Sequence, residues 1–225
     1  VCVDPNDIPA VAIVDPELMY SMPKGLTAAT GMDALTHAIE SYITPGAWVM
    51  SDMFELKAIE MIAQNLKAAV DNGKDVAARE AMSQAQYIAG MGFSNVGLGI
   101  VHSMAHPLGA FYDTPHGVAN ALLLPYVMEY NAESPAAPKY IHIAKAMGVD
   151  TTGMSEAEGV KAAIEAVKAL SISINIPQKL HEINVKEEDI PALAVAAFND
   201  VCTGGNPRPT SVADIEALYL SLIHI

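Results

Sequence analysis

The chain contains one strand-like segment, and almost everything after it has the periodicity of helices. Residues 9–15, PAVAIVD, form a short apolar run rich in β-branched side chains, which favours a buried strand. From Leu26 onward, apolar residues recur at spacings of three and four, as on the buried face of a helix. A single strand cannot form a sheet. The pattern therefore predicts an all-α domain preceded by the remnant of a strand-containing one.

Turn and capping residues divide the helical region into separate helices. We expect helices over residues 23–43, 52–72, 76–91, 100–110, 115–131, 138–147, 155–172, 187–201 and 211–222. Ser51 and Thr114 are the predicted N-caps of the second and fifth helices. Ser155 and Glu158 have the spacing of a capping box.

Composition excludes several classes of protein. The chain has 225 residues, of which 52% are hydrophobic and 17% charged, so it can bury a core and is not disordered. The net charge is -14 and no Lys/Arg cluster occurs, which argues against nucleic-acid binding. No apolar run approaches the roughly 20 residues that span a bilayer. Cys2 and Cys202 lie too far apart in sequence for a disulfide framework, so we expect a reducing, cytoplasmic location.

Histidines and one carboxylate suggest a metal site. Three histidines fall within residues 95–131, namely His102, His106 and His116. Upstream, Asp33 and His37 are four residues apart and therefore share one face of the predicted first helix. Carboxylate and imidazole together suit a borderline divalent ion such as Fe²⁺, Zn²⁺ or Mn²⁺. Spacing alone leaves ordinary core or surface histidines as the alternative.

Three other features have simpler interpretations. Glu40 follows His37 by three residues and can orient an imidazole from behind, but a solvent-facing role is the simpler interpretation. Residues 97–99, GLG, begin like a dinucleotide fingerprint, yet His102 occupies the third glycine position. Residues 203–208, TGGNPR, are typical of a loop that ends a helix. We interpret the final LSLIHI as a docked terminus or a non-native end.

Two segments resemble a known family. GMDALTHAIESY (31–42) and GLGIVHSMAHPLGAFYDTPHGVANALLLPYVMEYN (97–131) resemble the iron-containing (group III) alcohol dehydrogenases. DVCTGGNPRPTSVADIEALY (200–219) is similar to the branch that contains lactaldehyde (1,2-propanediol) oxidoreductases. The resemblance covers residues 1 to about 220. It implies the helical C-terminal domain of the dehydroquinate-synthase-like fold, with residues 1–22 as the remnant and interdomain segment and 23–225 as the metal-binding catalytic domain.

The resemblance also assigns roles to residues. The family's metal ligands fall on Asp33, His37, His102 and His116. His106 matches a histidine near the nicotinamide that relays protons. Phe93 and Cys202 match residues of the substrate channel, and Leu18 and Met22 lie in the segment that touches NAD. The family's N-terminal nucleotide-binding domain carries a GGGS-type phosphate loop that is missing from this sequence.

The implied activity is NAD-dependent oxidation or reduction of a small alcohol or aldehyde, such as a 1,2-diol or 2-hydroxyaldehyde. The implied cofactors are Fe²⁺, with Zn²⁺ as a competitor, and NAD(H); the implied partners are the missing N-terminal domain and a second copy in a homodimer. One alternative is a lyase of the dehydroquinate synthase type, which needs a basic cluster near the metal, where only Arg208 is a candidate. Another is a non-catalytic metal-binding helical module.

Overall fold

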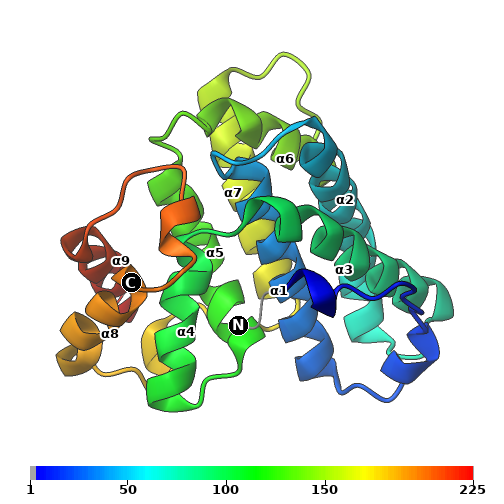
Figure 1. The fold of residues 1–225 in the computed structure, drawn as a ribbon, viewed down its shortest axis with the longest axis horizontal. Helices are drawn as coiled ribbons and strands as arrows, with labels where there is room; N and C mark the ends of the chain where they lie inside the picture. The colour runs from blue at the N-terminus through cyan, green and yellow to red at the C-terminus, as the bar shows by residue number, and fades with distance from the viewer. Residues whose placement is uncertain (1–3, 225) are drawn as a thin grey trace.

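The computed structural model describes residues 4–224, and within that range the chain consists of helices and loops (Figure 1). The α-helices are α1 Lys24–Ile43, α2 Val49–Asp71, α3 Val76–Val96, α4 Ile100–Tyr112, α5 His116–Asn131, α6 Tyr140–Ala146, α7 Glu156–Ser173, α8 Ile190–Phe198 and α9 Val212–His224. The 3-10 turns are η1 Pro5–Asp7, η2 Pro16–Met19, η3 Ala137–Lys139, η4 Leu180–Ile183, η5 Glu187–Asp189 and η6 Thr203–Gly205. The predicted all-α fold is confirmed.

Helix α1 lies at the centre of the domain. It packs against α2 and α3 on one side and against α5 on the other, while α4 contacts α5 and α8 (Figure 1). Most of its residues are buried, and Met32, Leu35 and Ile39 are fully inaccessible to solvent. Because its neighbours cover it on several sides, polar residues of α1 are held inside the domain and must find partners there.

The predicted strand is absent from the described part of the chain. Residues 9–15 form no regular element, and Val11 and Ile13 are 76% and 89% exposed. A strand is defined by hydrogen bonds to a neighbouring strand, and no second extended segment pairs with this one within residues 4–224. The β-branched composition of residues 9–15 was therefore insufficient to predict a strand, because a strand also needs a hydrogen-bonded partner strand.

Most helices begin and end near the predicted residues, with three informative differences. Helix α2 starts at Val49, and Ser51 lies in its first turn, where its hydroxyl accepts a 2.9 Å hydrogen bond from the Trp48 amide. Thr114 is not the N-cap of α5, because Pro115 occupies that position without a side-chain cap. Helix α3 runs past residue 91 and stops at Gly97, whose φ of 87° breaks the helix. The capping box of Ser155 and Glu158 is confirmed.

The ends of the described chain bear on two further predictions. Leu222 and Ile223 are almost fully buried in α9, which agrees with a docked terminus. Cys2 lies outside the described residues, and Cys202 is a free thiol.

No helix within residues 4–224 combines the length and apolar character needed to cross a membrane.

Candidate metal centre

Asp33 and His37 lie one turn apart on α1, as their spacing predicts. The His37 Nδ1 donates a 2.9 Å hydrogen bond to the backbone carbonyl of Asp33, which leaves Nε2 as the nitrogen with a lone pair. Burial and the neighbouring His102 together lower the pKa of His37 to about 4, against the opposing effect of Asp33. The imidazole is therefore neutral at physiological pH, as a metal ligand must be.

His102 comes from the first turn of α4 and faces α1. Its side chain is 2% exposed, and its Nδ1 lies 2.6 Å from Oε2 of Glu40. The other nitrogen, Nε2, is buried, has no hydrogen-bond partner, and lies 3.9 Å from Oδ1 of Asp33. A buried polar nitrogen without a partner destabilises the fold unless a bound ion, water or ligand interacts with it.

Glu40 has the role that the sequence offered as an alternative, because its carboxylate orients an imidazole. It is 2% exposed, so the predicted solvent-facing role is wrong. The carboxylate accepts hydrogen bonds from the backbone amide of Val101, at 2.7 Å, and from the ring of His102. A Cβ atom on residue 99 would lie 2.8 Å from Oε1 of Glu40, so the absence of a side chain at Gly99 lets the carboxylate lie close to the start of α4. Glu40 thus caps the positive end of α4 and fixes the His102 ring.

His116, the first residue of α5, approaches the same carboxylate. Its Nε2 lies 3.4 Å from Oδ1 of Asp33 and 3.0 Å from Nδ2 of Asn120, which itself donates to Asp33 Oδ1 at 2.5 Å. Burial lowers the pKa of His116, which favours the neutral ring. Asn120 follows His116 by four residues, so helical spacing alone could have marked it as part of the site.

The four predicted ligands therefore converge on Asp33. One ligand atom each from Asp33, His37 and His102 can be chosen so that all lie within 4.8 Å of one another. His116 lies outside that tight group but contacts Asp33 directly. One carboxylate, neutral imidazoles and an unpartnered buried nitrogen match the ligand chemistry of a borderline divalent ion, so the residues present fit a metal.

The other predicted site residues surround this cluster. Phe93 from α3 stacks on His37 with ring centroids 4.5 Å apart. His106 stacks on His116 at 5.3 Å and makes a 2.7 Å contact from Nδ1 to Oδ2 of Asp200, a residue that sequence reasoning did not identify. Burial raises the pKa of the Cys202 thiol to about 12, with the charge of Asp200 adding to the effect.

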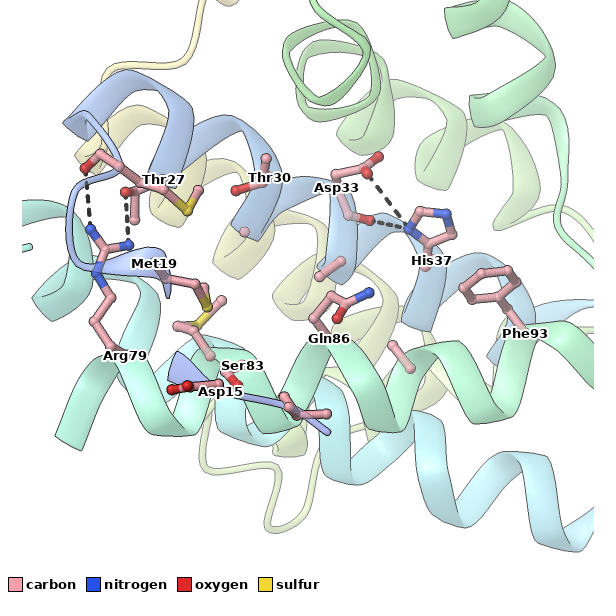
Figure 2. Close-up of a pocket in the computed structure, with 16 residues that line it drawn as sticks. Asp15, Met19, Thr27, Thr30, Asp33, His37, Arg79, Ser83, Gln86 and Phe93 are labelled. Atoms are coloured by element: carbon pink, nitrogen blue, oxygen red, sulfur yellow. Dashed lines mark hydrogen bonds and ion pairs between the residues drawn. The ribbon is translucent and has the colours of Figure 1, made fainter. Parts of the chain in front are cut away.

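A cavity of about 430 Å³ adjoins the cluster between α1, α3 and the segment that precedes α1. Figure 2 shows Asp33 and His37 toward one end and Arg79 at the other. The guanidinium of Arg79 donates to the Met22 carbonyl and the Thr27 hydroxyl (Figure 2). Met22 lines this cavity, whereas Leu18 does not and is 81% exposed.

Comparison with known proteins agrees with this geometry. Residues 27–223 match the model of the Fe-containing alcohol dehydrogenase family, C-terminal. The chain is 60% identical over 219 residues to lactaldehyde reductase of Escherichia coli (strain K12), covering 97% of this chain and 56% of that protein.

Solved structures give the same result. A crystal structure of 1,3-propanediol oxidoreductase superposes with a TM-score of 0.91 at 46% identity, covering 93% of this chain and 55% of that one. Sulfoacetaldehyde reductase from Bifidobacterium kashiwanohense, solved in complex with NAD⁺, gives 0.89 at 30% identity, covering 99% and 56%.

The helical fold is that of the C-terminal domain of the iron-containing alcohol dehydrogenases, and the His/Asp cluster is a candidate metal site within it. The chain belongs to the iron-containing alcohol dehydrogenase family. It spans about half the length of the curated relatives it matches.

Proposed function

We propose that this chain is the metal-holding part of an NAD-dependent oxidoreductase that interconverts a small alcohol and its aldehyde. The observation that supports this most directly is the buried, unpartnered Nε2 of His102, which faces the carboxylate of Asp33. No protein group satisfies that nitrogen within the described chain, and a divalent ion would. The likeness to an E. coli lactaldehyde reductase favours a 1,2-diol or 2-hydroxyaldehyde as substrate.

Asp33, His37, His102 and His116 would hold the ion, which we propose to be Fe²⁺ with Zn²⁺ as a competitor. When bound, such an ion supplies Lewis acidity toward an alcohol or carbonyl oxygen. With a divalent ion bound, a single carboxylate and three neutral imidazoles would leave the site with a net charge of about +1, which would stabilise negative charge on a substrate oxygen. Phe93, packed on His37, would exclude water on one side of the site.

His106 is the proposed proton-transfer residue. It lies beside His116 without belonging to the tight ligand group, and its ring is 34% exposed, so it can exchange protons with solvent. NAD would come from a nucleotide-binding region outside this chain, with Met22 at the edge of the cavity that adjoins the cluster. Cys202 remains a candidate for contact with substrate.

Metal loading of the chain itself tests this proposal. The purified chain is stripped with a chelator and titrated anaerobically with Fe²⁺, and separately with Zn²⁺, by calorimetry, with elemental analysis after desalting. We expect one ion per chain, lost in Asp33→Asn and His102→Ala. His181→Ala is the matched control, because the His181 ring hydrogen-bonds to the Ile223 carbonyl and lies outside the cluster. Full occupancy in both site variants would refute the assignment.

Activity is tested after joining the chain to an N-terminal NAD-binding half. NAD-linked turnover of propane-1,2-diol, ethanol, butanol and glycerol is then compared. Turnover of none of these, with metal bound, would favour the lyase or the non-catalytic alternative over the oxidoreductase.

A further inference from the structure

One hydrogen-bonded pair beside the proposed metal centre has no part in holding the ligands. Asp200 lies in the turn after α8, and its Oδ2 is 2.7 Å from Nδ1 of His106, although 94 residues separate the two in sequence. The Asp200 side chain is 17% exposed. Such a contact requires the turn after α8 to be placed accurately against α4.

The protein holds Asp200 in place from both sides. Its Oδ1 accepts a 2.9 Å hydrogen bond from the backbone amide of Cys202. Burial acts to raise the pKa of Asp200, but the hydrogen bonds from Cys202 and His106 together outweigh it and lower the pKa. Thr203, in the same turn, donates to the Ala197 carbonyl at 2.7 Å and lies 2.8 Å from the Ser103 hydroxyl. Ser103 lies on α4 between His102 and His106, so the turn is fastened to the helix that carries both histidines.

A fixed carboxylate decides which nitrogen of His106 carries the proton. Because a carboxylate can only accept, Nδ1 must be the donor, and Nε2 keeps its lone pair. The same contact holds the ring nearly parallel to His116, at an interplanar angle of 15°. Without Asp200, either nitrogen could carry the proton and the ring could turn.

We propose that Asp200 is a positioning residue that holds His106 in the Nδ1–H tautomer, so that Nε2 takes the proton released when an alcohol is oxidised. This role rests on the proposed function. The alcohol loses its hydroxyl proton to Nε2 and its carbinol hydride to the nicotinamide of NAD⁺, giving carbonyl, NADH and an imidazolium that later returns the proton to water. In the reducing direction every transfer runs in reverse. Asp200 stays ionised throughout and never touches substrate.

The tautomer is measured first, on the chain alone. Zn²⁺ is used because it is diamagnetic, and ¹⁵N-labelled histidine gives long-range ¹H–¹⁵N spectra that distinguish protonated from unprotonated ring nitrogens. We expect a single Nδ1–H tautomer for His106 and its loss in Asp200→Ala. Asp150→Ala, at an exposed position in a loop, is the control and should leave the spectrum unchanged. An identical His106 spectrum in Asp200→Ala would overturn the proposal, whether or not the protein is an oxidoreductase.

Kinetics of the enzyme joined to its NAD-binding half give the second readout. We expect Asp200→Ala to lower kcat by about 10- to 100-fold, with KM and metal content unchanged. Asp200→Glu should recover part of the loss. In His106→Ala, adding Asp200→Ala should cause no further loss, because Asp200 acts only through His106. If Asp200→Ala lowers kcat equally in the unsubstituted enzyme and in His106→Ala, or if it causes loss of metal, Asp200 has a general structural role instead. Absence of turnover in the unsubstituted enzyme would refute the proposed function and leave the tautomer result to decide the Asp200 contact.

Discussion

The carboxyl group of Glu55 should make this protein less stable as the pH rises from 5 to 7. Glu55 lies on α2, is 0% exposed, and neither of its side-chain oxygens has a hydrogen-bond partner in the described structure. Its carboxyl occupies space left by Gly92 on α3, where a Cβ atom would lie 1.9 Å from Oε1. Burial raises the pKa of Glu55 to about 8; the Ser41 hydroxyl acts against the shift, and the charge of Asp52 adds to it.

The direction and size of the effect follow from proton linkage. Between an unfolded pKa of 4.5 and a folded pKa of about 8, the folded state binds more protons than the unfolded state, so raising the pH favours unfolding. Each pH unit inside this window removes about 1.4 kcal/mol of the free energy of unfolding. From pH 5 to pH 7, Glu55 therefore lowers the stability by about 2.5 kcal/mol, because the slope is shallower near each pKa.

Urea unfolding of Glu55→Gln and of the original protein, compared at each pH, measures how much Glu55 changes the free energy of unfolding. The amide is neutral at every pH, so the difference in unfolding free energy between the two proteins should grow by about 2.5 kcal/mol from pH 5 to pH 7 and level off above pH 8. Other titrating groups cancel in that difference. Glu60→Gln, on the same helix but in an exposed pair with Lys57, should give a difference that does not change with pH. A Glu55→Gln difference that is equally flat would show that Glu55 is ionised in the folded protein.

Three further outcomes follow from the geometry. Glu40→Gln should weaken metal affinity about 10- to 100-fold in calorimetric titrations, because the amide holds His102 less firmly; unchanged affinity would remove Glu40 from the site. Gly92→Ala should destabilise the fold by about 1–3 kcal/mol through its clash with Glu55, seen as a lower Tm, and Gly90→Ala, which meets nothing within 4 Å, is its control. The chain alone should show no NAD-linked turnover, and a micromolar NAD affinity by calorimetry would contradict the need for a separate nucleotide-binding half.

The helices and the Asp33–His37 pair of the proposed metal site were predictable because both depend on short-range spacing. Asp33 and His37 are four residues apart, so any helix places them on one face, and the periodic apolar residues of α1 predict that helix. His102 and His116 were assigned by resemblance, and the structure brings both to Asp33.

Contacts between distant segments were not predictable in the same way. Nothing in the sequence near Asp200 indicates that its turn lies against His106, because that contact depends on how α8 packs on α4. Glu40 looked solvent-facing because charged residues usually are, and only the burial of α1 shows otherwise. The strand over residues 9–15 failed for a related reason, since strand formation depends on a partner that the local sequence does not specify.

The position of Glu40 has a consequence for how the proposed metal centre is built. The carboxylate that holds the His102 ring also accepts a hydrogen bond from the Val101 amide in the first turn of α4. The same contact that caps the start of the helix therefore also orients the His102 ring. The free energy of folding, rather than that of metal binding, therefore orients His102. The proposed centre is preorganised by its own secondary structure, and an ion bound there would meet a geometry that it does not have to impose.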